Sequence, residues 1–208
     1  WAARVRDAEV VIGVAGPNGF EARCTVSAPG HWREITSISA DGCWAYGFVD
    51  DGVARHLLEI DVKAAKSRRI TEGSVVVAAP VAIRDGAVFL QENSCTPLEV
   101  HVYQRHSPPR QVSRVHAKLN LSAVAEPEVV RYEGPAGSIE GMLVRPSAQA
   151  GRAPWPMVVF AHGGPWSHVR CGFSTLVAAH GSAAAFHLAA QGYAVLMPNF
   201  RGSTGYGS

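Results

Sequence analysis

A weak internal repeat with a period near 40 residues constrains the fold of the first half of this 208-residue chain more than any other feature. Three short turns each precede an apolar run: Arg6-Asp7-Ala8 precedes VVIGV, Ala40-Asp41-Gly42 precedes CWAYGF, and Arg84-Asp85-Gly86 precedes AVFLQ. Hardly any helical period is present before about residue 115. Short apolar runs of this kind, separated by Gly, Asp, Pro and Asn, are typical of an all-β region.

The later part of each unit repeats as well. LEIDV at Leu58–Val62 matches LEVHV at Leu98–Val102, and the three units end at Ile35-Thr36, Ile70-Thr71 and Val112-Ser113. A period near 40 with several strands per unit is the signature of propeller blades. An ordinary β-sandwich is the alternative. Because propellers need at least four blades, we expect residues 1–122 to be a partial propeller of about three blades.

The pattern changes after about residue 120. Glu128–Glu133 and Ser138–Val144 are two strand-like runs around the turn Gly134–Gly137, which predicts a hairpin. Met157–Ala161 is apolar throughout, as in a strand in the middle of a sheet that is covered on both faces.

A helix is predicted over Ser182–Gln191, with Ser182 as its N-cap and Gly192 as its stop. Tyr193–Met197 is then a second fully apolar strand. Strand, helix and strand in this order predict a parallel pair joined by a right-handed crossover. We therefore expect residues 123–208 to begin an α/β domain.

Composition excludes several classes of partner. With 47% hydrophobic and 17% charged residues and a net charge of +2, the chain is globular and is not built for nucleic acid or an anionic membrane. Its longest apolar run, Val75–Ile83, is interrupted by Pro80 and falls well short of the roughly 20 residues of a spanning helix.

The four cysteines are dispersed and have no His at ligand spacing, so we expect neither a metal nor a cofactor. We expect a cytoplasmic protein whose natural chain starts before Trp1.

The motif His162-Gly163-Gly164-Pro165 follows the apolar run 157–161, where open α/β sheets bind their ligands. Glycines let the backbone pass close to a bound group and adopt torsions closed to other residues. In α/β-hydrolases, a loop of HGGG type donates a backbone N–H to the oxyanion of the reaction, which is worth about 3 kcal/mol. Since proline has no N–H, we expect Gly164, or else Gly163, to be the donor. The other interpretation is a simple turn from strand to helix.

Three motifs together resemble the prolyl oligopeptidase family of serine peptidases, and most of all its acylaminoacyl-peptidase branch: HGGP, GYAVL at 192–196 and NFRGSTGYG at 199–207. That family places a β-propeller before an α/β-hydrolase domain of three layers, so the resemblance covers nearly the whole chain. It implies that Gly164 supplies the oxyanion N–H and that His162 braces the loop. Arg201 would tie down the loop 199–207 or contact substrate.

Two departures from the family's pattern follow HGGP. Val169 and Cys171 stand where family members often have Asp and Trp, and residues 171–181 form a longer stretch. They put the local loop geometry and the fit of substrate in question.

The nucleophile that such an enzyme needs is not found in the chain. No Ser lies on a G-x-S-x-G elbow, since neither Ser174 nor Ser203 has both flanking glycines. The resemblance implies that the Ser, Asp and His of the triad follow Ser208. We therefore expect a fragment, inactive alone, of a serine peptidase that cleaves short peptides through an acyl-enzyme. An esterase or lipase-like hydrolase and a noncatalytic propeller-containing binding protein are the alternatives. Homo-oligomerisation of the full-length protein is left open.

Overall fold

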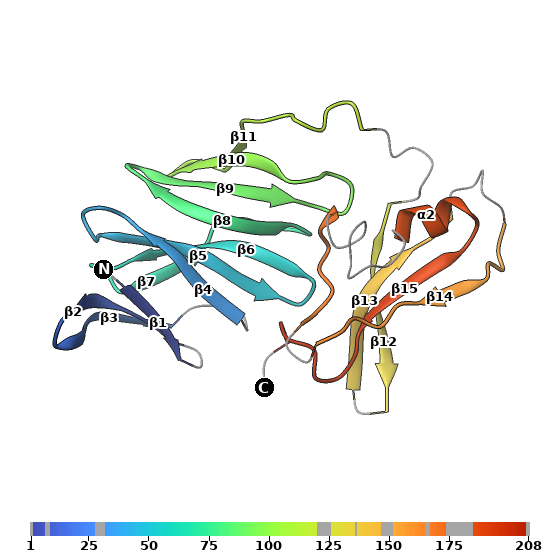
Figure 1. The fold of residues 1–208 in the computed structure, drawn as a ribbon, viewed down its shortest axis with the longest axis horizontal. Helices are drawn as coiled ribbons and strands as arrows, with labels where there is room; N and C mark the ends of the chain where they lie inside the picture. Colours follow the sequence, from blue (N-terminus) through green and yellow to red (C-terminus); the bar gives the residue numbers. More distant parts are fainter. Residues whose placement is uncertain are drawn as a thin grey trace.

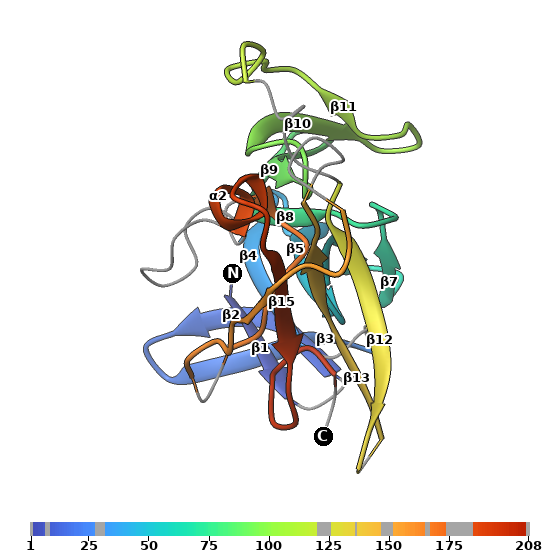
Figure 2. The ribbon, with the colours of Figure 1, turned by 90° about the vertical axis from the view of Figure 1, so that its right-hand side faces the viewer.

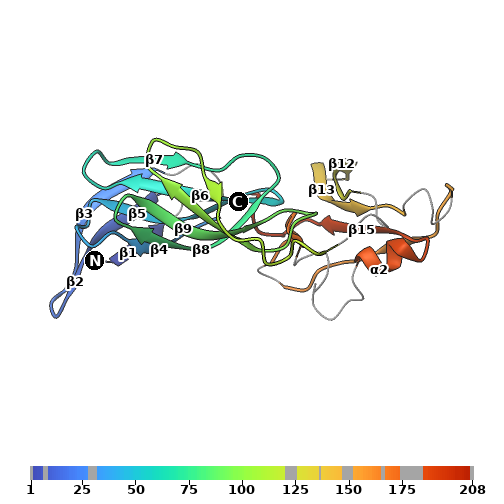
Figure 3. The same cartoon turned by 90° about the horizontal axis from the view of Figure 1, so that it is seen from above.

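The computed structural model describes residues 2–6, 9–27, 32–119, 126–135, 137–146, 152–164, 167–173 and 185–206. Most of these residues lie in β-strands, which form a set of sheets at the N-terminal end and a separate sheet at the C-terminal end (Figure 1). Seen from above, the two sets lie end to end and the molecule is elongated (Figure 3). In the described part of the chain, no helix is long and apolar enough to span a bilayer.

The N-terminal strands form three antiparallel meanders, of which the second and third belong to one eight-stranded sheet. The first is β1 (Ala2–Arg6), β2 (Glu9–Gly16) and β3 (Gly19–Ser27). The second is β4 (Trp32–Ile38), β5 (Trp44–Asp51), β6 (Ala54–Asp61) and β7 (Lys66–Arg69). The third is β8 (Val76–Ile83), β9 (Gly86–Glu92), β10 (Glu99–Gln104) and β11 (Arg110–Gln111). A single parallel bridge between Arg55 and Val76 joins the second to the third. The meanders match the predicted blades.

The sequence repeat follows these strands. Its apolar runs form β2, β5 and β9, each the second strand of its meander, and the LEIDV and LEVHV segments lie largely in β6 and β10, the third strands. One part of the predicted repeat is wrong. Ile70 and Val112 follow the last strand of their units, but Ile35 and Thr36 lie in β4, the first strand of the second meander. An apolar-hydroxyl pair is too short a signal to mark a strand's place in a blade.

The middle meander is buried on both faces because alternate residues of a strand point to opposite sides. Ala45 and Leu58 pack towards the first meander, in a core that includes Val10 and Ile12. Tyr46 and Leu57 pack on the other side, in a core shared with Phe89 and Tyr103 of the third meander. Each side chain of this size contributes about 1.5–3 kcal/mol when it is fully buried. Burial on both faces distinguishes stacked blades from a two-layer sandwich.

The C-terminal sheet has the strand order β12-β13-β15-β14. Its strands are β12 (Glu128–Gly134), β13 (Gly137–Val144), β14 (Met157–Val159) and β15 (Ala194–Asn199). The predicted hairpin is confirmed, since β12 and β13 pair in antiparallel fashion from Glu128 to Gly134. The predicted parallel pair is confirmed too, because β14 runs parallel to β15. Figure 2 shows β13 and β15 side by side in this sheet.

Helix α2 (Ala185–Ala190) lies between the two parallel strands in the sequence. It ends before Gly192, whose φ of +91° suits the predicted stop. The proposed N-cap, Ser182, lies outside the described residues. Phe186 and Ala189 of the helix pack with Met142 and Val195 of the sheet. Helix and sheet thus share one core.

The prediction that Met157–Ala161 lies in the middle of a covered sheet is wrong for the described residues. Among these, β14 is an edge strand paired only with β15, and Met157 and Val159 are 55% and 60% exposed. An apolar run predicts a strand but does not tell how many neighbours it has. The predicted domain boundary after residue 122 lies outside the described residues.

Candidate functional site

The two glycines of the HGGP motif lie beyond the carboxyl end of β14. The parallel pairing continues to Phe160, whose N–H donates to the Leu196 carbonyl at 2.7 Å, and the chain then leaves the sheet. Gly163 and Gly164 are exposed, and a Cβ at Gly163 would meet no atom within 4 Å. The structure records no hydrogen-bond acceptor among the described residues for either amide. As far as the described residues go, both N–H groups can therefore bind another group.

The backbone torsions of these glycines differ from the sequence-based expectation. Neither Gly163 nor Gly164 has a positive φ, so this backbone path does not need the special torsions of glycine. What glycine provides at position 163 is open space beside the backbone. That favours close approach of a bound group over the simple-turn interpretation.

The His162 side chain joins this loop to the loop that follows β15. Its Nε2 lies 2.8 Å from the Ser203 Oγ, its Nδ1 lies 2.8 Å from the Gly163 carbonyl oxygen, and its ring stacks on Phe200 with centroids 4.5 Å apart. A carbonyl oxygen can only accept, so in the neutral imidazole the proton is on Nδ1 and Nε2 is an acceptor; the Ser203 hydroxyl lies within hydrogen-bond distance of both this Nε2 and the Phe200 carbonyl oxygen, the latter at 2.6 Å. These contacts hold the start of the loop.

Ser203 and His162 have the separation of a nucleophile and its base, but the environment of the serine does not suit attack. Ser203 is only 9% exposed. The Phe200 carbonyl oxygen, 2.6 Å from its Oγ, competes with His162 for the single hydroxyl proton, whereas a nucleophile must transfer its proton to the base. The pair is a structural brace, in agreement with the lack of a nucleophile elbow around Ser203.

The next residue, Thr204, holds the other end of the same loop. Its backbone N–H donates to the Ser167 carbonyl at 3.0 Å, and its hydroxyl lies 2.8 Å from the Nδ1 of His168. Pro165, the last residue of the HGGP motif, and Trp166 lie outside the described residues. Two adjacent hydroxyl residues thus contact His162 before the undescribed residues and Ser167 and His168 after them.

Asn199, at the end of β15, fixes Val169, which follows His168 in the chain. Its side-chain amide accepts the Val169 N–H at 2.6 Å and donates to the Val169 carbonyl at 3.0 Å. The amide also donates to the Tyr206 hydroxyl at 2.7 Å, which in turn donates to Glu140 at 3.2 Å. Because burial and the nearby Glu140 both disfavour the phenolate, the pKa of Tyr206 is raised.

Arg201 lies in the same loop but takes no part in these braces. It is exposed, and the structure records no hydrogen bond or ion pair for it among the described residues. It borders a cavity of about 510 Å³ that Ser138, Asn199 and Tyr206 also line. These contacts therefore do not support the prediction that Arg201 ties down the loop 199–207.

A buried charged cluster connects the end of this segment with the second meander. The Asp50 carboxylate accepts two hydrogen bonds from Arg55, at 2.6 and 3.0 Å, and one from Arg170 at 3.4 Å. The same oxygen faces the Nε2 of His168 at 3.7 Å. Burial acts to raise the pKa of Asp50, but the bonds from Arg55 and the charge of Arg170 outweigh it and lower the pKa.

His168 is neutral at neutral pH. Burial lowers its pKa to about 4, and the positive charge of Arg170 adds to this effect. The ring packs tightly: a Cβ at Gly205, whose φ is +91°, would lie 3.2 Å from the His168 Nε2. A carboxylate opposite Nε2 favours the tautomer with its proton there, so Nδ1 accepts the Thr204 hydroxyl proton.

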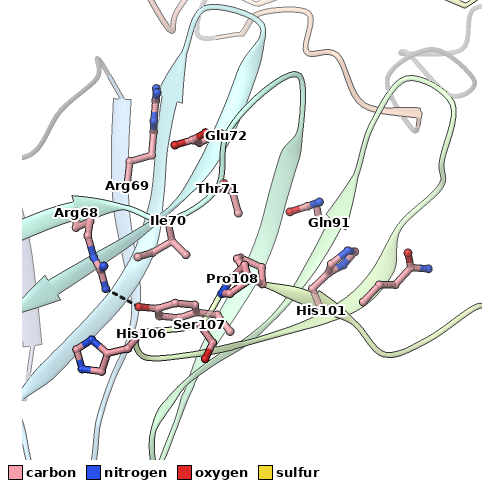
Figure 4. Close-up of a pocket in the computed structure, with 13 residues that line it drawn as sticks. Arg68, Arg69, Ile70, Thr71, Glu72, Gln91, His101, His106, Ser107 and Pro108 are labelled. Carbon is pink, nitrogen blue, oxygen red and sulfur yellow. Dashed lines mark hydrogen bonds between the residues drawn. The ribbon is translucent and has the colours of Figure 1, made fainter.

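A separate cavity of about 670 Å³ opens between the second and third meanders (Figure 4). Arg68, His101 and His106 contribute to its lining, and Arg68 donates to the Tyr103 hydroxyl at 2.7 Å and pairs with Glu59 at 2.8 Å. None of its lining residues belongs to the segments 162–164 or 199–206. No group of His, Cys, Asp or Glu in the described ranges could hold a metal ion.

Sequence reasoning found the glycine loop and His162 but missed the residues around them. In the sequence, Asn199 and Thr204 are parts of a motif without a role of their own, Ser203 is considered only as a nucleophile and excluded, and nothing distinguishes His168 or Asp50. The signal for the first three was the unusual density of hydroxyl and amide residues among the glycines of NFRGSTGYG. Asp50 gave no such signal, because Asp-Asp-Gly is an ordinary turn sequence.

No family model matches the sequence. Two curated proteins match parts of it. The uncharacterized peptidase YuxL of Bacillus subtilis (strain 168) is 36% identical over 89 residues, which is 40% of this chain and 12% of that protein. The dipeptidyl aminopeptidase BIII of Pseudoxanthomonas mexicana is 47% identical over 55 residues, 26% of this chain and 7% of that protein. The chain therefore spans a small share of these relatives.

Solved structures share the fold. The acylaminoacyl peptidase of Pyrococcus horikoshii matches 84% of this chain and 26% of its own, with a TM-score of 0.67 and 21% identity. A puromycin-hydrolyzing peptidase of Mycobacterium tuberculosis matches 96% of this chain and 31% of its own, with a TM-score of 0.66 and 19% identity. Together, the partial sequence matches to peptidases and the shared fold confirm the resemblance to the prolyl oligopeptidase family that the HGGP and NFRGSTGYG motifs indicated.

Proposed function

We propose that this chain is part of a serine-type peptidase that hydrolyses short peptides through an acyl-enzyme, and that Gly164, with Gly163, stabilises the oxyanion. One observation carries the proposal: both glycines are exposed beyond the carboxyl end of a parallel strand, with no acceptor recorded for their amides in the described part of the chain. Negative charge develops on the carbonyl oxygen of the substrate during acyl transfer. Unoccupied, fixed N–H groups are what stabilises it.

The assignment of domains is part of the proposal. Residues 1–122 are about three blades of a β-propeller, supported by meanders that bury both faces of the middle one. Residues 123–208 are the N-terminal part of an α/β-hydrolase domain, supported by the parallel pair β14 and β15 with helix α2 between them in the sequence. A propeller beside the active site would admit short, unstructured peptides and exclude folded proteins.

The chemical step needs residues that lie beyond this chain. We place the nucleophilic Ser, the His that accepts its proton and the Asp that orients the His after Ser208, in the remainder of a longer enzyme. The Ser oxygen attacks the peptide carbonyl, the His transfers the proton to the leaving amine, and water then hydrolyses the acyl-enzyme. Within this chain, His162 and Ser203 fix the glycine loop before substrate arrives, so no reorganisation is needed during the reaction.

A fluorophosphonate probe tests the proposal on the natural full-length protein. We expect one serine outside the present chain to be labelled. The rate of peptide anilide hydrolysis should fall in proportion to the fraction of protein that is labelled. Acyl esters assayed beside the anilides distinguish a peptidase from an esterase. A full-length protein that is folded but not labelled would contradict the proposal and favour a noncatalytic binding protein.

A further inference from the structure

Asp50 belongs to the second meander, yet it contacts the segment that follows the glycine loop. It is the last buried residue of β5, with a side chain that is 1% exposed. Arg55, on the partner strand β6, donates two hydrogen bonds to the Asp50 carboxylate from one side. On the other side, a single carboxylate oxygen faces Arg170 at 3.4 Å and His168 at 3.7 Å. One carboxylate thus joins a blade hairpin to residues 168–170.

The side chains of His168 and Arg170 depend on Asp50 for a partner of opposite charge. The Nε2 of His168 and the Nε of Arg170 are buried and have no hydrogen-bond partner among the described residues. The Arg170 guanidinium is held beside Asp50 by charge and by one long hydrogen bond. A buried guanidinium needs a compensating negative charge to stay in place. Removal of the Asp50 charge would therefore release Arg170 and the backbone that carries it.

The backbone around Asp50 is held rigidly against the same loops. The Gly52 N–H donates to the Gly205 carbonyl at 3.1 Å, and the Val53 carbonyl accepts the Cys171 N–H at 2.8 Å. The Val53 N–H donates to Glu140 at 2.9 Å. Asp50 is therefore presented from a fixed hairpin to one end of the segment 162–168, while Ser203 holds the other end.

We propose that Asp50 is a positioning residue for the glycine loop: through Arg170 and His168 it fixes the residues 167–170 that follow the loop, and so the direction of the Gly163 and Gly164 amides. The inference rests on the proposed function, because the amides matter only if they bind an oxyanion. It adds a residue of the blade region to the machinery of acyl transfer. The charge states agree with this role, since the Asp50 pKa is lowered by Arg55 and Arg170 in spite of burial, and His168 is neutral.

The test compares Asp50→Asn with Asp51→Asn in the natural full-length protein. The two substitutions are isosteric and adjacent, but the Asp51 side chain is 56% exposed and pairs with Arg69 on β7, not with the segment 167–173. Oxyanion contacts develop in the transition state, so their loss lowers kcat and leaves KM nearly unchanged. A displaced loop costs on the order of 10- to 100-fold in rate.

We expect Asp50→Asn to lower kcat for a peptide anilide by about 10- to 100-fold with KM within about threefold, and Asp51→Asn to change neither. Equal kcat values for Asp50→Asn and the parent, or equal losses in the two variants, would overturn the inference. If Asp50→Asn does not fold, Arg170→Gln decides by the same comparison: a lower kcat at unchanged KM supports the inference, and a parental kcat refutes it.

The outcomes also separate this inference from the proposed function. A parent protein that no fluorophosphonate labels would remove the proposed function and the inference with it. A labelled parent together with a fully active Asp50→Asn variant would remove only the inference.

Discussion

The Nε2 atom of His162 lies 2.8 Å from the Oγ atom of Ser203, which comes 41 residues later in the chain. The adjacent Thr204 makes the equivalent contact with His168 at 2.8 Å. The loop after β15 therefore holds the loop after β14 at both ends. This relationship gives a physical reason for the joint occurrence of HGGP and NFRGSTGYG: the second motif fixes the shape of the first.

Ser203→Ala removes the brace at His162. The variant loses the hydroxyl that contacts both the His162 Nε2 and the Phe200 carbonyl oxygen. We expect the free energy of unfolding to fall by about 1–2 kcal/mol, because a buried hydrogen-bond partner is left unsatisfied. Thermal unfolding of the full-length protein measures the effect. Ser74→Ala is the control, since Ser74 is exposed; equal unfolding midpoints for the two variants would contradict the brace.

Asn199→Asp tests the clamp on Val169 with almost no change in shape. One carboxylate oxygen can still accept the Val169 N–H, but the other faces the Val169 carbonyl, where the amide donates at 3.0 Å. We expect a loss of about 2–4 kcal/mol in the free energy of unfolding at pH 7, since a buried acceptor then opposes an acceptor. Burial opposite an acceptor raises the pKa of the new carboxyl above its usual value, so the loss should shrink as the pH falls towards about 4, where the protonated carboxyl can donate. A variant as stable as the parent at pH 7 would exclude the clamp.

Gly163→Ala and Gly205→Ala separate two uses of glycine. A Cβ at Gly163 meets open space, whereas one at Gly205 lies 3.2 Å from the Gly52 carbonyl oxygen on a backbone with φ of +91°. We expect Gly163→Ala to keep its unfolding midpoint but to hydrolyse peptides about tenfold more slowly, because its methyl group meets the bound substrate. Gly205→Ala should lose about 1–3 kcal/mol of stability. The reverse pattern would show that Gly163 has only a structural role.

The buried His168 predicts a loss of stability in mild acid. Its folded pKa of about 4 lies below the value of about 6.5 for a free histidine. Folding thus favours the neutral form of His168. The resulting contribution to the free energy of unfolding is fully present above about pH 6.5 and is lost as the pH falls towards 4. The shift corresponds to about 3 kcal/mol. His168→Gln removes the titration, so the difference in stability between parent and variant should change across this interval. A difference independent of pH would contradict the assignment.

The blades could be predicted from the sequence because their signal is local. The run in β5 alternates its side chains between two cores, the runs in β2 and β9 each pack in one of them, and the turns before the runs recur with a period near 40 residues. The hairpin β12–β13 and the parallel pair β14–β15 could be predicted for the same reason. The edge position of Met157 and Val159 could not, since an apolar run has the same composition whether it has one neighbour or two.

The braces of the candidate site depend on contacts between distant segments, which no local pattern records. Asp50 begins an Asp-Asp-Gly sequence, where carboxylates are normally solvated, and one of the groups that pair with its buried carboxylate is Arg170, 120 residues further on. Ser203 and Thr204 likewise look like ordinary turn residues between Gly202 and Gly205. Only the packed loops reveal that their hydroxyls face His162 and His168.

A crystal structure of the full-length protein after reaction with a fluorophosphonate tests the central claim most directly. The phosphonyl oxygen of the adduct takes the place of the oxyanion. The account predicts that this oxygen lies about 2.7–3.1 Å from the backbone nitrogen of Gly164 or Gly163, with His162 still in contact with Ser203. An oxygen held by other donors, with both glycine amides directed away from it, would contradict the account.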